Sequence, residues 1–411
     1  MSSDDKKLKW FREARFGMFI HWGIYSVPAQ GEWAMFYNDW DYNYYDAFKE
    51  RFNPLKFDPA YWAELAWNAG MRYVVFTTKH HDGFCMYDSK FTDYKITNTP
   101  YKKDITAELV KAFRAKGLKI GLYHSLVDWR HEDFIPDPEH PLWKRGERDF
   151  KNRDLAKYRE YLYNQVRQLL TEYGKIDLLF FDYTSKHKTS AEWDAEKMLE
   201  LVYSLQPEII VNDRLTYEKT SKVWDYCTPE VTVPNSQVKI DGVEYDWETC
   251  MTMNGHWGYC AQDKGFKSPQ TILEALIKCS SLNGNLLLNI GPDALGQIPP
   301  GSVNIMENLS EWMKINSESV HGTEKSSHTP PRGMVYTQKG KTLYLHLFSP
   351  PMGDVILPEL NGKIKNISLL ADNSDVPMIT HWGTELLDKK EIRIRPPTSI
   401  PPMSVLKISL K

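Results

Sequence analysis

The sequence predicts an α/β protein in which a (β/α)8-type, TIM-like barrel is followed by a small C-terminal β-sandwich. Over the first three quarters of the 411 residues, short β-branched or aromatic runs alternate with amphipathic helical stretches, the pattern of parallel βα units. Eight such runs are present, the number that closes a barrel of this type. After Pro330 the rhythm changes to short strands and turns. We therefore predict a barrel over residues 1–328 and a sandwich over residues 329–411.

The predicted barrel strands are short apolar runs at residues 16–20, 73–77, 119–123, 178–181, 208–211, 223–226, 247–251 and 286–290. Their number and their alternation with helices favour a closed barrel over an open, doubly wound sheet. A nucleotide-binding sheet is disfavoured further, because neither GxGxxG nor GxxxxGK[ST] occurs in the chain.

Three of the intervening helices carry clear boundary signals. Residues 155–173 place apolar side chains every three or four positions, as one buried helix face requires, and Gly174 supplies the stop. Asp104 is placed to cap a helix that ends before Gly117. Ser268 and Pro269 open another helix, which runs to about residue 282.

The C-terminal segment contains strand signals without helical periodicity. A hairpin is predicted from residues 334–337 and 342–348 around the turn at 338–341, and further strands are predicted near 354–357, 364–370, 391–395 and 405–410. Alternating strands of this length indicate a sandwich of roughly 75 to 80 residues.

Composition excludes several classes of protein. The formal net charge of −3 shows no basic excess of the kind that nucleic acids or anionic membranes attract, so we expect neither as a partner. No apolar run approaches about 18 residues, and the N-terminus lacks the apolar core of a signal peptide, so a cytoplasmic location is expected. The five cysteines have irregular spacings, which favours buried, reduced thiols.

Polar residues follow nearly every predicted strand. In a parallel barrel the active site lies at the carboxyl ends of the strands, so these side chains are expected to converge. One or two polar strand ends are ordinary, whereas polar residues at almost all of them predict an enzyme. They are His21, Trp22, Lys79, His80, His81, Asp82, His124, Asp182, Asn212, Asp213, Arg214, Glu230, Glu248 and Asn289.

Asp182 is the strongest candidate for a catalytic carboxylate. It ends an apolar run, and a carboxylate at the rim of a buried strand is costly unless it has a role, of which capping the next helix is the alternative. Glycoside hydrolysis needs two carboxyl groups facing the scissile bond, about 5 to 5.5 Å apart for retention of configuration. Glu230, on a loop shaped by Pro229, and Glu248 are the two candidates for the partner.

The histidines at the strand ends suit a polyhydroxylated ligand. As uncharged donors and acceptors, His21, His80, His81 and His124 match the directional hydrogen bonds of sugar hydroxyls. A metal site at 80–82 is disfavoured, because neighbouring residues of an extended chain point to opposite sides and no HExxH motif occurs. We therefore expect neither a metal ion nor another cofactor.

Two aromatic segments and one arginine complete the candidate site. Glu32 and Trp33, together with Trp257, combine aromatic faces with polar neighbours and fit a ligand with one apolar face, although each aromatic residue alone is more often part of a core. Arg214 is either an ordinary ion-pair partner or a group that orients a carboxylate or a hydroxyl.

These residues lie within strings that together are highly specific. The chain resembles the α-L-fucosidases of glycoside hydrolase family 29 from Trp10 to about Gly322. The strings that carry the resemblance are WFREARFGMFIHWGIYSVPAQGEW, AGMRYVVFTTKHHDGFCMYDSKFTDY, GLKIGLYHSLVDW, IDLLFFDY, IIVNDR, DYCTPE, WETCMTMNGHWGY and NGNLLLNIGPDALGQIP.

The resemblance implies a retaining, metal-free double displacement with Asp182 as nucleophile, acting on a fucosylated oligosaccharide or glycoconjugate. It implies that Glu230, in the family-like TPE string, is the acid/base, with Glu248 kept as the rival and otherwise as a substrate-binding residue. It also implies fucose contacts from His21, Glu32, Trp33, His80, His81, Tyr123, Arg214 and Trp257, the last near the C6 methyl group. Tyr123 enters through the resemblance alone, and Phe180 stands where the family often has Trp.

Two other functions are alternatives to a retaining α-L-fucosidase. The first is a carbohydrate-binding barrel without turnover, against which the two carboxylates argue. The second is a related retaining exo-glycosidase, such as an α-L-galactosidase, whose substrate carries one additional hydroxyl on C6. A homo-oligomer is compatible with the sequence, which does not specify the oligomeric state.

Overall fold

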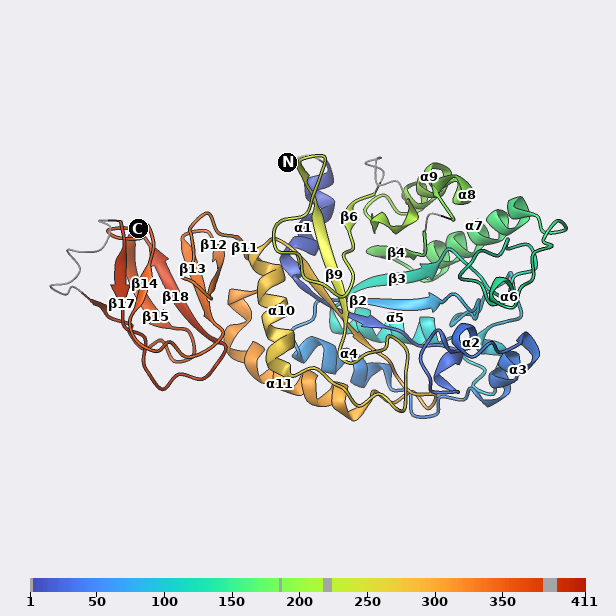
Figure 1. Ribbon diagram of the computed structural model, residues 1–411, viewed down its shortest axis with the longest axis horizontal. Coiled ribbons are helices and arrows are strands. Elements are labelled where there is room, and N and C mark those ends of the chain that lie inside the picture. Colours follow the sequence, from blue (N-terminus) through green and yellow to red (C-terminus); the bar gives the residue numbers. More distant parts are fainter. Residues whose placement is uncertain (1–2, 185–186, 217–223, 380–389) are drawn as a thin grey trace.

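The computed structural model describes residues 3–184, 187–216, 224–379 and 390–411. Eight parallel strands form the barrel, in the order β5-β4-β3-β2-β1-β10-β9-β6 (Figure 1). They are β1 Phe16–Ile20, β2 Tyr73–Lys79, β3 Lys119–Ser125, β4 Leu178–Asp182, β5 Ile210–Val211, β6 Tyr226–Cys227, β9 Asp246–Thr252 and β10 Asn285–Ile290. Each coincides with or overlaps a predicted strand, although Val223, the predicted start of the sixth, lies outside the described residues.

The barrel closes between its two shortest strands, β5 and β6. One parallel bridge joins Asn212 to Tyr226, the Asp225 amide donates to the Val211 carbonyl at 2.8 Å, and the Val211 amide donates to the Asp225 carboxylate at 2.9 Å. We call this junction, residues 210–212 with 225–227, the seam. A short antiparallel hairpin of β7 (Lys239–Ile240) and β8 (Val243–Glu244) lies between β6 and β9.

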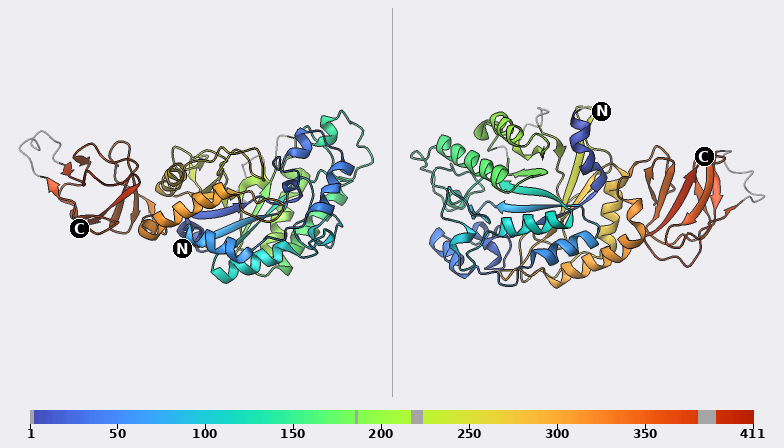
Figure 2. Two further views of the ribbon diagram at one scale, coloured as in Figure 1. Left: turned by 90° about the horizontal axis from the view of Figure 1, so that it is seen from below. Right: turned by 180° about the vertical axis from the view of Figure 1, so that it is seen from behind.

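Helices surround the barrel, as the alternating pattern predicted (Figure 2). Asp104 caps α5 by accepting from the Ala107 amide, and Ser268 caps α10 by accepting from the Thr271 amide, so both predicted starts are confirmed. The helices are α1 Ser3–Ala14, α2 Ala34–Tyr37, α3 Tyr42–Asp46, α4 Pro59–Asn68, α5 Ile105–Lys116, α6 Pro141–Lys144, α7 Leu155–Glu172, α8 Ser190–Trp193, α9 Ala195–Leu205, α10 Pro269–Ser281 and α11 Pro300–Asn316. Short 3-10 helices are η1 Ile24–Ser26, η2 Ala47–Arg51, η3 Ile96–Asn98, η4 Asp213–Leu215 and η5 Ser317–Ser319.

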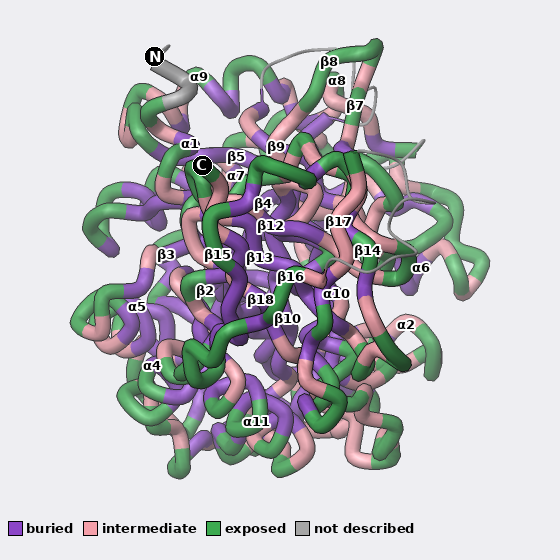
Figure 3. The backbone as a smooth tube through the Cα atoms, turned by 90° about the vertical axis from the view of Figure 1, so that its left-hand side faces the viewer, coloured by how far each residue is buried: buried purple, intermediate pink, exposed green. Residues whose placement is uncertain are grey.

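Buried residues concentrate along the barrel strands and on the inward faces of the helices (Figure 3). The large core lies between the strands and the helices, whereas a smaller cluster fills the barrel interior and includes Phe19, Tyr123, Phe180 and Cys250. Four cysteines are buried and Cys260 is half-buried, all as free thiols, in agreement with the expectation from their spacing.

The C-terminal strands form two antiparallel sheets that share one core, which makes a sandwich. The larger has the order β11-β12-β13-β18-β15 and the smaller the order β14-β17-β16. Leu345 and Leu406 of the first and Leu357 and Ile394 of the second belong to the same buried cluster. The strands are β11 Glu324–Lys325, β12 Val335–Lys339, β13 Thr342–Leu347, β14 Val355–Leu357, β15 Ile364–Leu369, β16 Met378–Ile379, β17 Ile392–Ile394 and β18 Ser404–Leu410.

The sandwich packs against the helical side of the barrel, beside α10 and α11 (Figure 1). The Trp312 indole donates to the Met403 carbonyl at 2.8 Å, and Lys407 pairs with Glu318 at 2.8 Å. Because the first strand of the larger sheet is residues 324–325, the chain enters that sheet just before the predicted domain boundary at residue 328, which stays a prediction.

Candidate active site

A cavity of about 540 Å³ opens at the carboxyl ends of the barrel strands. It is the position that parallel barrels use for catalysis, because the loops after different strands meet there. The residues that line it are Phe19, His21, Glu32, Trp33, His80, His81, Tyr123, Phe180, Asp182, Tyr183, Thr184, Asp213, Arg214, Thr216, Thr228, Pro229, Glu230, Cys250 and Trp257. Of the residues that the resemblance assigns to catalysis or to fucose binding, all but Glu248 line this cavity. The strand-end candidates that do not line it are Trp22, Lys79, Asp82, His124, Asn212, Glu248 and Asn289.

Asp182, the last residue of β4, presents its carboxylate to this cavity. Oδ1 accepts from the Arg214 guanidinium at 2.8 Å and from the Tyr183 amide at 2.9 Å, and Oδ2 accepts from the Tyr123 hydroxyl at 2.8 Å. Burial acts to raise the pKa of Asp182, but the charge of Arg214, together with the hydrogen bonds from Arg214 and Tyr123, outweighs it and holds the pKa below its ordinary value. The carboxylate is thus kept ionised and oriented, as a nucleophile must be.

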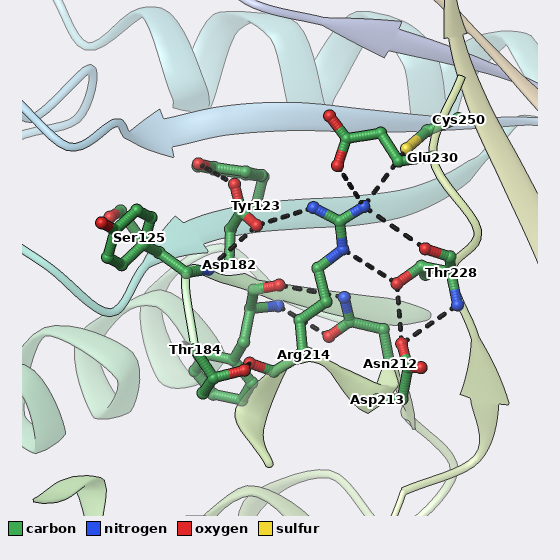
Figure 4. A network of polar contacts seen from close by, with 12 residues as sticks. Tyr123, Ser125, Asp182, Thr184, Asn212, Asp213, Arg214, Thr228, Glu230 and Cys250 are labelled. Atoms are coloured by element: carbon green, nitrogen blue, oxygen red, sulfur yellow. Dashed lines mark hydrogen bonds and ion pairs between the residues drawn. The ribbon is translucent and has the colours of Figure 1, made fainter. Parts of the chain in front are cut away.

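Arg214 joins two carboxylates from different strands. It lies in η4, directly after β5, and its Nη1 and Nη2 atoms lie 2.8 Å from Asp182 Oδ1 and 2.8 Å from Glu230 Oε2 (Figure 4). Its Nε donates to the Thr228 hydroxyl at 2.9 Å, which fixes the plane of the guanidinium. The planar fork of arginine is suited to hold two anionic groups at a fixed spacing.

Glu230 occupies the rim of the cavity, after β6. The backbone there is anchored to β9, because the Val231 amide donates to the Cys250 carbonyl at 2.9 Å and the Cys250 amide donates to the Pro229 carbonyl at 3.2 Å. Its side chain is 44% exposed, compared with 17% for Asp182. The more exposed carboxyl group is the one that can exchange protons with a departing group and with water.

Glu248, the rival carboxylate, lies elsewhere. It projects into the amino-terminal half of the barrel, where the Tyr73 hydroxyl donates to its Oε2, and it does not line the cavity. It is fully buried, and burial raises the pKa of Glu248 to about 8. The sequence shows that Glu248 belongs to a strand, but not how deep along the barrel axis its side chain lies.

Three of the four candidate histidines meet in the cavity. Burial is the largest cause that lowers the pKa of each ring, to about 3 for His21, to about 4 for His81 and well below the usual range for His80. The three rings are therefore neutral at neutral pH. Neutral imidazoles offer one donor and one acceptor each, which suits hydroxyl groups.

The placement of His80 and His81 differs from the sequence prediction. Because β2 ends at Lys79, the two residues are no longer in an extended strand, and both rings face the same cavity with centroids 4.1 Å apart. The argument that alternation separates them was therefore wrong. Among the residues that the structure describes, no group of three or more His, Cys, Asp or Glu is arranged to hold a metal ion.

His124 does not reach the cavity. In β3 the side chains alternate, so Tyr123 points into the barrel interior and binds Asp182, while His124 is buried on the other face with Nδ1 3.2 Å from the Thr78 hydroxyl. Choosing His124 from the strand end alone was therefore wrong. The position one residue earlier, supplied by the resemblance, is the one in the site.

The remaining wall combines one acid with aromatic rings. Glu32 accepts from the Gly258 amide at 2.7 Å, and burial raises its pKa. Trp33 packs edge-on against His81 at 5.4 Å between ring centroids, and Trp257 lies 5.0 Å from His21 and 5.9 Å from Phe19. This wall therefore combines a buried carboxyl group with two indole rings.

Several lining residues were not selected from the sequence. Phe19 and Phe180 belong to strand interiors, where apolar residues are typical of a core, and Tyr183 was not singled out within the IDLLFFDY string. Tyr183 has a φ of 79°, in the left-handed region that non-glycine residues rarely adopt, and this conformation directs its amide to Asp182. A single sequence carries no sign of that backbone conformation.

The residues of this cavity lie within a region of the chain whose sequence is similar to known proteins. The family model described as Alpha-L-fucosidase matches residues 1–318, which include every residue of the cavity. The chain belongs to the α-L-fucosidase family. A mouse tissue α-L-fucosidase is 31% identical over 97% of this chain and 91% of its own length, and the human tissue enzyme is 29% identical over 92% and 82%.

Solved structures of the α-L-fucosidase family share the whole architecture. Isoenzyme 1 from Paenibacillus thiaminolyticus has a TM-score of 0.95 at 38% identity and covers 100% of both chains. A family 29 α-L-fucosidase from Bacteroides thetaiotaomicron has a TM-score of 0.86 at 26% identity, covering 99% of this chain and 96% of its own. That structure is of a covalent intermediate, trapped with 2-fluoro-fucosyl fluoride in a glutamate-to-glutamine variant.

Proposed function

We propose that Asp182 is the nucleophile and Glu230 the acid/base of this chain, a retaining exo-α-L-fucosidase of glycoside hydrolase family 29. The observation that carries the assignment is the Arg214 guanidinium, which binds both carboxylates at 2.8 Å. Two carboxyl groups held by one planar group are close neighbours, as double displacement at a separation of about 5 to 5.5 Å requires.

In the first step Asp182 attacks the anomeric carbon of a bound fucoside. A carbon–oxygen bond forms to the carboxylate while the bond to the leaving oxygen breaks, and protonated Glu230 transfers its proton to that oxygen. The Tyr123 hydroxyl and Arg214 hold the two Asp182 oxygens in fixed directions, so little reorganisation accompanies the attack.

In the second step a water molecule takes the place of the leaving group. Glu230, now a carboxylate, removes a proton from the water as its oxygen attacks the anomeric carbon, and Asp182 departs as a carboxylate. Two inversions at the same carbon give net retention. The exposure of Glu230 at the rim lets leaving group and water approach from the same side.

The shape of the cavity supports removal of a single terminal sugar. The site ends on Phe19, Phe180 and Trp257, an apolar floor that suits the C6 methyl group of fucose. A hydrophobic pocket rejects an added hydroxyl only weakly, so we expect a side activity on aryl α-L-galactosides. Comparing kcat/KM for the two aryl glycosides measures the preference, and equal values would argue against fucose as the natural sugar.

The decisive experiment is hydrolysis of an aryl α-L-fucoside by the wild type and by Asp182→Gly, with and without azide. We expect Asp182→Gly to lose activity and azide to restore it, giving a fucosyl azide of inverted configuration. Glu230→Ala is expected to lose turnover of substrates with poor leaving groups, whereas the matched variant Glu248→Gln keeps it. An inactive wild type would favour a binding protein, and an active Asp182→Gly without azide would exclude Asp182 as nucleophile.

The partner is a fucosylated oligosaccharide or glycoconjugate, by the same proposal. The net charge of −3 supports the expectation that nucleic acid is not a ligand. Within the described segments, no helix has the length and apolar character to cross a membrane. The cytoplasmic location and the homo-oligomer stay predictions, testable by fractionation and by light scattering.

A further inference from the structure

The hydrogen bonds behind His21 determine which of its ring nitrogens carries the proton. Asn289 Nδ2 donates to the backbone carbonyl of Trp257 at 2.7 Å, and a carbonyl can only accept. The orientation of the Asn289 amide is thereby fixed, with Oδ1 directed to His21 Nδ1 at 2.7 Å. Because that oxygen also can only accept, Nδ1 of His21 must be the protonated nitrogen.

An unrelated pair of residues imposes the same state on His81. The Ser125 hydroxyl donates its single proton to the Val127 carbonyl at 2.8 Å. Its oxygen lies 2.7 Å from His81 Nδ1 and can only accept there, so Nδ1 of His81 is protonated as well. Ser125 is fully buried, and no water is needed to complete the chain of donors and acceptors.

We propose that Asn289 and Ser125 are positioning residues that hold His21 and His81 in the Nδ1–H tautomer, so that both Nε2 atoms accept hydrogen bonds from hydroxyl groups of the sugar. The use of this device in catalysis rests on the proposed function. It extends that function by fixing the direction of two hydrogen bonds, from sugar to protein, and therefore the kind of group that the site selects.

The surroundings of His81 Nε2 show why the direction matters. Nε2 lies 3.9 Å from Asp182 Oδ2, so two acceptors face each other with no proton between them. Because Asp182 attacks the anomeric carbon, the hydroxyl group on the neighbouring carbon, C2, is placed beside the nucleophile, where it can donate to Nε2 of His81. The opposite tautomer would place an N–H beside the nucleophile and compete with the Tyr123 hydroxyl for its lone pairs.

Both rings are also prevented from carrying two protons. Burial is the main reason that the pKa of His21 falls to about 3 and that of His81 to about 4, so the acceptor on Nε2 is retained at neutral pH. Each ring is almost fully buried, with 4% exposure for His21 and 3% for His81. The state of these nitrogens is consequently set by their fixed partners and not by solvent.

The same device occurs away from the cavity and provides a matched control. In the sandwich, the Thr337 hydroxyl donates to the Ser319 carbonyl at 2.6 Å and lies 2.9 Å from His346 Nε2, which is therefore protonated. Thr337→Val removes that restraint without touching the cavity, and Val preserves the shape of the side chain.

The first test is the nitrogen NMR spectrum of histidine-labelled wild-type protein without ligand, which distinguishes the tautomers directly. We expect protonated Nδ1 on His21 and His81, and protonated Nε2 on His346. This arm needs no variant and no assumption about activity. Protonated Nε2 on either His21 or His81 would overturn the proposal.

The second test compares L-fucose with its 2-deoxy and 2-deoxy-2-fluoro analogues as competitive inhibitors of aryl fucoside hydrolysis. Fluorine accepts a hydrogen bond but cannot donate one, so in the wild type we expect both analogues to bind about tenfold more weakly than fucose. In Ser125→Ala, where either tautomer is allowed, the fluoro analogue is expected to bind more tightly than the deoxy analogue. Ser125→Thr and Thr337→Val are expected to behave as the wild type.

Failure of the proposal and failure of the proposed function give different results. Fluoro binding that exceeds deoxy binding in the wild type, or no change in Ser125→Ala, would overturn the positioning role while fucose still inhibits. If fucose itself does not inhibit, the fucosidase assignment fails, and the NMR spectrum still decides the tautomers.

Discussion

At the scale of single residues, Arg214 connects the electrostatics of the site to its geometry. Its half-buried guanidinium lies beside Phe180, with its centre 5.3 Å from the ring centroid, and it pairs with Asp182 and Glu230. A positive charge shared in this way keeps the nucleophile ionised although it is largely removed from water. Changes at this residue therefore alter the pH dependence of the reaction as well as its rate.

Arg214→Gln is expected to lower kcat/KM by about 100-fold, the scale of losing one preorganised charged donor. With the positive charge gone, the pKa of Asp182 rises, and because the nucleophile must be ionised the acidic limb of the pH profile moves to higher pH. The profile of kcat/KM measures both effects. Arg395→Gln, which breaks an exposed pair with Asp354, is the control, and an unshifted limb in Arg214→Gln would contradict the argument.

Glu248 is expected to make the stability of the folded protein depend on pH. Its pKa is raised to about 8 by burial, so the folded protein holds a proton that the unfolded chain releases above about pH 4.5. The stabilisation is complete below the unfolded pKa and is lost as pH rises through the folded value. Glu248→Gln removes this titration, so Tm of the variant relative to the wild type is expected to increase from pH 5 to pH 8.5; equal differences at both pH values would refute the account.

At the scale of elements, the site depends on how closely neighbouring loops approach. Gly291 follows β10 directly, and a Cβ atom there would lie 2.6 Å from the Trp257 carbonyl, which belongs to the loop after β9. This contact is between backbones, so no flexible side chain can yield. The position of Trp257 in the cavity floor thus depends on the absence of one methyl group.

Gly291→Ala is expected to displace the Trp257 loop, raising KM for aryl fucosides and destabilising the fold by about 1 to 3 kcal/mol. Kinetics and thermal unfolding measure the two effects. Gly353→Ala is the control, because a Cβ at Gly353 meets no atom within 4 Å and its φ is not positive. Unchanged KM in Gly291→Ala would show that the loop adapts.

The sequence predicted the elements well because apolar runs and capping residues are local signals. Each of the eight barrel strands coincides with or overlaps a predicted run, and Asp104 and Ser268 cap their helices as expected. How deep a side chain lies along the barrel axis, and in which direction it points, depend on the whole barrel and not on neighbouring residues in the sequence. Glu248 was therefore a candidate for a site that it does not reach. For the same reason His124 was selected where Tyr123 faces the nucleophile.

At the scale of the whole molecule, the barrel is least continuous at the seam. β5 and β6 have two residues each, whereas β2, β3 and β9 have seven. Side chains supplement the few backbone hydrogen bonds, since Asp225 binds the Val211 amide at 2.9 Å and Asp213 accepts from the Thr228 amide at 3.0 Å. The two strands that precede Arg214 and Glu230 are therefore joined largely through side chains.

Hydrogen exchange is expected to show this difference. The Asp225 amide, which bonds across the seam to Val211, is expected to exchange faster than amides of β1 or β10, because short pairings open at lower free energy than long ones. Mass spectrometry after deuterium labelling measures it. Equal protection at the seam and in the long strands would mean that the barrel opens only as a whole.

Arg214 also reaches from the β5 side of the seam to Thr228 and Glu230 on the β6 side. The contacts that Arg214 makes in the active site therefore also help to close the barrel. A redesign that replaces Glu230, for instance to make the enzyme form glycosidic bonds, also removes the Arg214–Glu230 ion pair across the seam. The lower thermal stability that follows will look unrelated to catalysis. Reinforcing the junction elsewhere before altering the acid/base is the practical remedy.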